Sequence, residues 1–289
     1  MAVQLIDPSK TQRLERILIY GDPKTGKTRL ATSLPDSWGR VLYVGADAGA
    51  ESLAPVLATY RNRLVVLKPS GGTDPKSNPH YDAFDIATRD WTKEVGRIGE
   101  GVKTLVWDTM TSTALDILSY VATSGQFSAG AHISLGTPGS AEHQKLPMQG
   151  DYMATHNIIS RLVDFLFKQP LHLIVICHAT FDEPRDGGGA EGGPATAGKA
   201  TVRSFPGRFD AVIHLQRRSS GAGGVGMGGA AASSVVTAFT ERHGIWSAGV
   251  RSGHASNPMP RVDLASDPRH FWESWAEHYG QKPVAAVAA

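Results

Sequence analysis

The chain has 289 residues, enough for one large domain or two small ones, and its 41% hydrophobic and 19% charged residues are ordinary for a globular protein. A net charge of only +2 excludes a global basic field, so any site for a polyanion must be a local patch. The single cysteine, Cys177, excludes disulfide bonds within the chain, and no segment has the pattern of a signal peptide or the apolar length of a membrane span, so we expect a cytoplasmic protein without membrane contact.

Short apolar segments alternate with helix-favouring segments from residue 17 to residue 178. We expect strands at 17–20, 41–45, 63–67, 104–108 and 171–178, and helices from about residue 26 and over 49–59, 81–100, 112–123 and 151–167. These strands are continuously apolar, which is typical of a parallel sheet that helices cover on both faces. The pattern therefore predicts an α/β fold with crossover connections.

The pattern changes after residue 205. Segments 211–216, 234–241 and 244–251 are predicted to extend the same sheet as antiparallel strands at its edge. Asp267 and Pro268 are predicted to start a short C-terminal helix, with Asp267 as its N-cap. We therefore divide the chain into a core, residues 1–265, and a short C-terminal helix with a loose tail, residues 266–289.

Glycine is unusually frequent and is clustered in the segments 186–200 and 219–234. Such segments have a high backbone entropy and small side chains, so we expect both to be loops without packed structure. The Gly-, Ser- and Pro-rich segment 124–150 is also predicted to be a loop.

The segment GDPKTGKT joins the first predicted strand to the first predicted helix and matches the phosphate-binding P-loop pattern G-x-x-x-x-G-K-[ST]. Its two glycines, Gly21 and Gly26, let the backbone bend so that successive N–H groups point toward phosphates, and the helix N-terminus adds partial positive charge. The alternative is an ordinary glycine-containing turn. The residues predicted to bind ATP are Gly21, Asp22, Pro23, Lys24, Thr25, Gly26, Lys27 and Thr28.

Three side chains of this loop have specific predicted roles. Lys27 is expected to reach the β- and γ-phosphates of ATP, and Thr28 is expected to ligate Mg²⁺. Lys24 is expected either to touch a γ-phosphate or to remain a solvated loop lysine.

Carboxylates follow two of the predicted strands. Asp108 ends the strand 104–108, where a Walker-B-type carboxylate would hold the hydration shell of Mg²⁺; the alternative is that it caps the next turn. Asp47 follows the strand 41–45, which we expect beside the P-loop strand, so it is the candidate that orients the attacking water. Glu51 competes for that role, and the alternative for both is a solvated loop carboxylate.

A polar residue also ends the most apolar predicted strand, 171–178. Ligands of open α/β sheets bind at the carboxyl ends of the strands, so His178 is predicted to sense the γ-phosphate and to signal to the glycine-rich segment that follows. The alternative is a strand-end imidazole bonded to a backbone carbonyl. Cys177 points the opposite way along the strand and is expected in the core.

The segment 199–261 carries eight basic residues and two acidic ones. A local basic patch beside glycine-rich loops suits DNA, bound mainly through its phosphates, and the candidate contacts are Lys199, Arg203 and Arg208. The alternative is a sheet edge with scattered arginines. Arg251 is a candidate arginine finger that acts on ATP across a subunit boundary.

A resemblance to the RecA-like P-loop ATPases rests on an ordered set of segments: GDPKTGKT, VLYVGAD, TLVWDTMTS, DYMATHNIISRLVDFLF, LHLIVICHAT and FPGRFDAVIHL. The chain looks most similar to small phage-encoded RecA-core proteins of single-strand annealing and recombination, over residues 12–255. The resemblance implies a RecA-like core with a mostly parallel sheet. It also implies a protein that needs ATP and Mg²⁺, binds single-stranded DNA, and forms homo-oligomeric rings or filaments with ATP between subunits.

The resemblance also assigns roles to residues. It places the catalytic carboxylate at Asp47, where the family usually has Glu, and the γ-phosphate sensor at His178, where the family has Gln. The segments 124–150 and 179–203 correspond to two DNA-binding loops, and Arg251 lies near the basic residues that act across the interface. The chain is too short for the additional domains of RecA, so full strand exchange is not implied.

The leading functional hypothesis is therefore a phage-type recombination ATPase that DNA stimulates. One alternative is a motor subunit, such as a hexameric helicase or a DNA-packaging ATPase, although such proteins usually carry a further domain. Another is a nucleotide-gated interaction module with little turnover. Unwinding of a forked substrate would favour the motor, and turnover that does not respond to DNA would favour the module.

Overall fold

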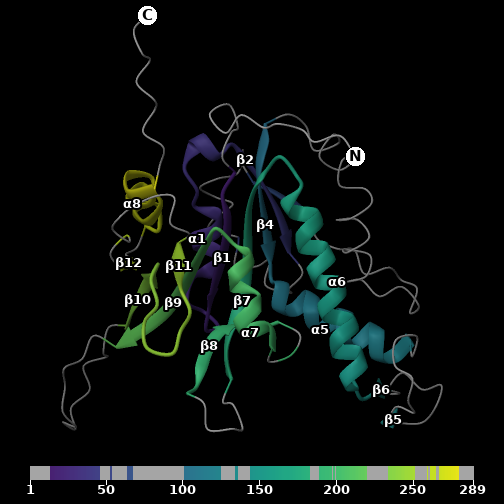
Figure 1. The fold of residues 1–289 in the computed structure, drawn as a ribbon. Helices are drawn as coiled ribbons and strands as arrows, with labels where there is room; N and C mark the ends of the chain where they lie inside the picture. The colour runs from purple at the N-terminus through teal and green to yellow at the C-terminus, as the bar shows by residue number, and fades with distance from the viewer. Residues whose placement is uncertain are drawn as a thin grey trace, which may run out of the picture.

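One large mixed β-sheet separates two apolar layers in the computed structural model of the protein (Figure 1). The structure describes residues 14–45, 53, 64–67, 101–124, 134–135, 144–182, 189–196, 198, 200–219, 234–250, 259, 261–264 and 267–279. Apart from Leu53, the predicted helices over 49–59 and 81–100 lie outside these residues.

Ten strands of the described residues form this sheet, in the order β12-β10-β9-β1-β7-β4-β2-β3, with β11 beside β9 and β8 beside β7. Their bounds are β1 (Arg16–Gly21), β2 (Arg40–Gly45), β3 (Leu64–Leu67), β4 (Val102–Asp108), β7 (His172–Asp182), β8 (Glu191–Pro194), β9 (Ala211–Ser219), β10 (Ser234–Phe239), β11 (Gly249–Val250) and β12 (Val262–Leu264). A separate two-stranded sheet pairs β5 (Ser134–Leu135) with β6 (Gln144–Lys145), inside the segment predicted to be a loop.

Neighbouring strands from β3 to β9 along this order pair parallel. The pairing is antiparallel between β9 and β10, between β9 and β11, between β10 and β12, and between β7 and β8. The predicted α/β class with a mostly parallel sheet and an antiparallel C-terminal edge is confirmed. Two details were wrong. The segment 211–216 is not antiparallel, because β9 pairs parallel with β1, from Ile17 beside Ala211 to Gly21 beside Leu215. The predicted strand over 244–251 is reduced to β11.

The position of β2 also differs from the prediction. It lies between β4 and β3, so β7 and β4 separate it from the P-loop strand β1. The prediction that Asp47 follows a strand next to β1 is therefore wrong. Asp47 itself lies outside the described residues.

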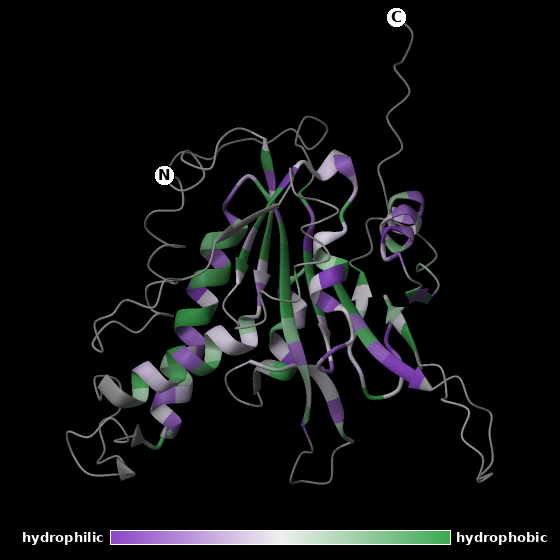
Figure 2. Cartoon of the chain, turned by 180° about the vertical axis from the view of Figure 1, so that it is seen from behind, coloured by the Kyte–Doolittle hydropathy of each residue, from purple (hydrophilic) through white to green (hydrophobic). Residues whose placement is uncertain are grey.

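Helices cover both faces of the sheet (Figure 1). On one face, α5 (Met110–Ser124) and α6 (Gln149–Phe167) pack against side chains such as Leu18 and Val175. On the other face, α1 (Lys27–Thr32) and α8 (Arg269–Tyr279) pack against neighbours such as Ile19 and Ile176. Figure 2 shows the central strands coloured as apolar along their length, as expected for strands buried on both faces. No helix in the described ranges has both the length and the apolar character needed to cross a lipid bilayer.

The C-terminal helix α8 forms as predicted around Asp267. The Asp267 carboxylate accepts a hydrogen bond from the backbone N–H of Arg269 at 3.0 Å. Hydrogen bonds from the side chain and backbone of Arg269 lower the pKa of Asp267 to about 2. On the buried side of the helix, the indole Nε1 of Trp272 donates to the carbonyl oxygen of Leu30 in α1 at 2.8 Å. This helix therefore packs directly on the helix that follows the P-loop.

The glycine-rich segment 186–200 is not structureless throughout. It contains β8, and α7 (Ala200–Ser204) begins at its end, followed by a 3₁₀ turn at Pro206–Arg208. A Cβ atom at Gly192 would overlap the indole ring of Trp246. The prediction was wrong here because glycine lowers the strand propensity of a segment but does not prevent a strand. At Gly192 the missing side chain allows close packing. Residues 220–233 of the second cluster lie outside the described residues.

Candidate active site

The P-loop encloses the ammonium group of its own lysine. Lys27 is only 6% exposed, and its Nζ donates to the carbonyl oxygens of Gly21 at 2.8 Å and Asp22 at 2.7 Å. The loop reaches this shape through left-handed backbone at two positions, Lys24 with φ of 64° and Gly26 with φ of 79°. The Thr25 hydroxyl donates to the Asp22 carbonyl at 2.8 Å and closes the turn.

Glycine is needed at the first position of the motif, Gly21, for a different reason from the one predicted from the sequence. Gly21 is the last residue of β1, and a Cβ atom there would overlap the carbonyl oxygen of Leu215 in β9. Glycine is needed at this position because β9 approaches closely, whereas Gly26 supplies the left-handed turn.

Asp108 and Thr28 meet although 80 residues separate them in sequence. The Thr28 hydroxyl donates to Oδ2 of Asp108 at 2.5 Å. Asp108 is the last residue of β4 and is only 4% exposed. It precedes a cis peptide bond to Thr109. The two residues that the sequence assigned to Mg²⁺ thus lie in direct contact, and their metal role stays a prediction.

A second hydroxyl reaches the same carboxylate oxygen. Tyr43, a buried residue of β2, donates from its phenol to Oδ2 of Asp108 at 2.8 Å. Tyr43 was not predicted from the sequence. The available signal is weak: one phenol inside an otherwise apolar strand, on the same face as Val41 and Gly45.

Burial and charge act in opposite directions on Lys27. Burial lowers the pKa of its ammonium group, while the negative charges of Asp108 and Asp22 raise it. The lysine and the carboxylate of Asp108 therefore belong to one electrostatic unit at the ends of β1 and β4, which β7 separates.

His178 lies beside the P-loop but does not end its strand. It pairs in register with Gly21, and β7 continues four residues further to Asp182. The prediction of a strand-end histidine is therefore wrong in that detail. The half-buried side chain stays a candidate γ-phosphate sensor because of its position next to Gly21.

The backbone of His178 is tied to two other segments through Thr111 in α5. The Thr111 hydroxyl accepts the N–H of His178 at 2.9 Å and donates to the carbonyl oxygen of Ala195 at 2.6 Å. The N–H of Ala195 donates in turn to the carbonyl oxygen of His178 at 2.7 Å. The segment after β8 is therefore fastened to the strand next to the P-loop.

An arginine of β9 holds the tip of the P-loop. The Arg217 guanidinium donates to the backbone carbonyl oxygen of Lys24 at 2.6 Å, and the Lys24 side chain is exposed. This role of Arg217 was not predicted from the sequence, because the contact joins residues 193 positions apart.

The candidate DNA contacts are engaged elsewhere or lie outside the described residues. Arg203 forms an ion pair with Glu191 at 2.8 Å. Arg208 pairs with Asp164 of α6 and also donates to the carbonyl oxygen of Ser160 at 3.2 Å. Both arginines therefore have structural partners within the chain. Lys199 and Arg251, like Asp47 and Glu51, lie outside the described residues.

On the other side of β1 lies an aromatic–histidine stack, formed by Tyr20, His214, Phe239, His243 and Trp246. The His214 ring lies 4.6 Å from the rings of both Tyr20 and Trp246, and its Nδ1 lies 2.7 Å from Nε2 of His243. The Tyr20 phenol donates to the carbonyl oxygen of Ser247. This cluster was not predicted from the sequence, because its members come together through the pairing of β9 with β1 and with β10 and through the turn after β10.

Burial keeps this stack neutral. Burial, together with the charges of His243 and Lys27, lowers the pKa of His214 to about 3. Burial also lowers the pKa of His243, assisted by the charge of Arg218. Burial raises the pKa of the Tyr20 phenol.

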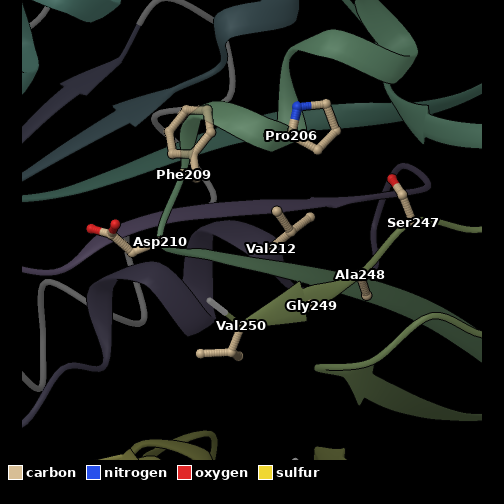
Figure 3. A pocket seen from close by; sticks show the side chains of 9 residues that line it. Pro206, Phe209, Asp210, Val212, Ser247, Ala248, Gly249 and Val250 are labelled. Atoms are coloured by element: carbon tan, nitrogen blue, oxygen red, sulfur yellow. The ribbon is translucent and has the colours of Figure 1, made fainter. Parts of the chain in front are cut away.

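A pocket lies at the opposite end of β9 from the P-loop. It is lined mostly by apolar side chains, and Figure 3 shows Phe209, Val212 and Val250 around it, with Asp210 as the single acidic group that it labels. Val212 pairs with Leu18 near the start of β1, whereas the P-loop follows Gly21 at its end. This pocket is therefore separate from the Lys27 and Asp108 cluster.

The loop between β1 and α1, the buried carboxylate at the end of β4, and the sheet that joins them define a P-loop ATPase domain. A protein-family model described as "AAA domain" matches residues 14–244, and the chain belongs to that family.

No curated protein sequence matches the chain. Among solved structures, a prototypical ATPase from the type III secretion system of pathogenic bacteria is similar over 70% of this chain, with 14% identity and a TM-score of 0.38. The chain spans about half of that protein, 51% of its length. The match is too distant to carry an inference about fold, activity or partners.

Proposed function

We propose that the protein binds ATP with Mg²⁺ at the P-loop, hydrolyses it, and uses this cycle on single-stranded DNA in recombination or annealing of the phage type. The observation that carries the nucleotide part is the cluster of Lys27, Thr28 and Asp108. It combines a buried ammonium group within a P-loop with a hydroxyl and a carboxylate in direct contact.

The donor set suits Mg²⁺. Thr28 and Asp108 present oxygen atoms, which hard cations prefer, and Mg²⁺ commonly takes one or two protein ligands and completes its shell with water and substrate phosphates. In the part of the chain that the structure describes, no three His, Cys, Asp or Glu side chains gather to form a larger metal cage. When bound, the ion would neutralise charge that develops on the transferred phosphoryl group.

The remaining groups of the cycle have proposed roles. Lys27 would bind the β- and γ-phosphates, and Asp47 or Glu51 would orient the attacking water. His178, one strand from Gly21, would sense the γ-phosphate, and Arg251 would act on the ATP of a neighbouring subunit in a homo-oligomer. The Thr111 contacts that bind His178 to Ala195 support a connection from this sensor to the segment that follows it.

The DNA part rests on the basic excess of residues 199–261 and on the resemblance to RecA-like recombination proteins. Lys199, Arg203 and Arg208 are the proposed contacts. Because Arg203 is paired with Glu191, the matched variants are Arg203→Ala and Glu191→Gln, which both break the ion pair. Loss of DNA affinity in Arg203→Ala alone would assign the arginine to DNA. Equal loss of DNA affinity in both variants would show that the arginine stabilises the fold and does not bind DNA.

The test is steady-state ATP hydrolysis at low salt with Mg²⁺, with and without single-stranded DNA. We expect turnover that DNA increases and that Lys27→Ala abolishes. ATP binding without a response to DNA would contradict the recombination role and would favour a nucleotide-gated module. Unwinding of a forked substrate would favour a motor.

A further inference from the structure

The carboxylate of Asp108 is held by hydroxyl groups from two different elements. Thr28 of α1 and Tyr43 of β2 both donate to Oδ2, at 2.5 Å and 2.8 Å. Asp108 and Tyr43 are only 4% and 2% exposed, so water does not easily replace a lost donor. These two donors, one from a helix and one from a strand, restrict the rotation of the Asp108 carboxylate group.

The fold makes room for this phenol. β2 pairs parallel with β4, and in that register Tyr43 lies beside Val106 while Gly45 lies beside Asp108. Tyr43 is thus two residues short of the carboxylate, and its ring spans the gap along the sheet face. A Cβ atom at Gly45 would lie 3.0 Å from Cε1 of Tyr43, so glycine at this position leaves the ring free to reach Asp108.

The geometry points to Tyr43 as a positioning residue that orients Asp108 and, through it, the Thr28 hydroxyl for Mg²⁺. This inference rests on the proposed binding of Mg²⁺ and ATP at the P-loop. Groups that hydrogen-bond to metal-binding residues orient them, and their loss costs metal affinity although they do not touch the ion. Without the phenol, Asp108 loses one of the two hydroxyl donors at Oδ2, so its carboxylate is held less firmly in the metal position.

The test compares two single-atom deletions in the full-length protein. Tyr43→Phe removes the hydroxyl that donates to Asp108. Tyr20→Phe is the matched control, because it removes another buried tyrosine hydroxyl, which donates to the backbone oxygen of Ser247. Binding of a fluorescent, non-hydrolysable ATP analogue is measured by titration over a range of Mg²⁺ concentrations and in EDTA, with thermal unfolding of each variant alongside.

We expect Tyr43→Phe to raise the Mg²⁺ concentration for half-maximal tightening of analogue binding by roughly 10- to 100-fold. Analogue affinity in EDTA should stay unchanged, and Tyr20→Phe should follow the unaltered protein. In an Asp108→Asn background, Tyr43→Phe should have no further effect on the Mg²⁺ dependence.

Three results would overturn the inference. An unchanged Mg²⁺ midpoint in Tyr43→Phe would show that the phenol does not position the carboxylate. An equal shift in both phenylalanine variants would show a general packing effect. A reduced affinity in EDTA with no change in Mg²⁺ dependence would place Tyr43 in the nucleotide pocket. If the unaltered protein binds the analogue without responding to Mg²⁺, or does not bind it, the proposed function fails, and this inference fails with it.

Discussion

Two polar clusters lie on opposite faces of the sheet, near the end of β1. They differ in whether their polar groups carry charge. The phosphate-side cluster of Lys27, Thr28, Tyr43 and Asp108 holds an ammonium group and a carboxylate. The aromatic–histidine stack holds imidazoles that burial keeps neutral. Each cluster contains a buried tyrosine hydroxyl, but only that of Tyr43 donates to a charged group. The charged groups thus lie at the proposed nucleotide site, whereas the neutral rings of the stack contribute packing on the other face of the sheet.

The largest effect is expected on ATP affinity, from a change in the cluster that holds the charged groups. Lys27→Ala should weaken ATP binding by at least about 100-fold, because it removes the buried cation that would meet the phosphates. Isothermal titration with ATP and Mg²⁺ measures the change. Lys168→Ala is the control, since it removes an exposed lysine at the end of α6, outside the P-loop. Normal ATP affinity in Lys27→Ala would remove the P-loop assignment.

Asp108→Asn keeps the size of the side chain and removes its charge. Turnover with Mg²⁺ should fall roughly 100-fold, because metal assistance to phosphoryl transfer is worth several kcal/mol. The measurement is the rate of phosphate release at saturating ATP. Asp164→Asn, which removes the carboxylate paired with Arg208 far from the P-loop in sequence, should leave that rate unchanged. Equal rates in the two variants would separate Asp108 from the metal.

A change in the aromatic–histidine stack should lower stability and leave nucleotide affinity intact. Gly192→Ala places a methyl group against the Trp246 ring and should cost about 1–3 kcal/mol in the free energy of unfolding. Gly189→Ala is the control, since nothing lies within 4 Å of the added methyl group. Urea unfolding measures the difference. Weaker ATP binding by Gly192→Ala without a change in stability would show that the stack is part of the site.

The smallest effect concerns the dependence of the free energy of unfolding on pH. The pKa of His214 is about 3 in the folded protein, below the ordinary value of 6.5, so the unfolded chain binds more protons between these values. The free energy of unfolding should therefore decrease as pH falls below about 6.5, by at most about 1.4 kcal/mol per pH unit from this group.

Melting temperatures at pH 7, 6 and 5 test this. His214→Phe should reduce the acid dependence in that range, and replacement of the exposed His278 by Gln should not. An identical pH dependence in both variants would show that His214 does not contribute.

The sequence predicted the parts of the site that depend on local order. The P-loop and Asp108 were found because an apolar run, a turn and a helix follow one another directly in each case. Tyr43 could not be assigned, because its contact with Asp108 depends on the order and register of β2 and β4. The contact of Arg217 with Lys24 depends likewise on β9 lying beside β1.

The errors in the fold have the same origin. The parallel direction of β9 requires a crossover before it, and the short helix α7 in that connection was read as part of a loop. The strand β8 was missed because glycine composition reports backbone entropy, whereas the packing of Trp246 on Gly192 is a tertiary contact.

The contact between Trp272 and Leu30 has a consequence for the order of events during synthesis. The helix after the P-loop is only six residues long, too short to be stable alone, and the partner of its Leu30 carbonyl lies 242 residues later. A ribosome-bound chain that already displays the whole P-loop motif still lacks α8, which buries Phe271, Trp272 and Trp275 against this face. The contact of Trp272 with the nucleotide-binding helix can therefore form only after α8 has left the ribosome.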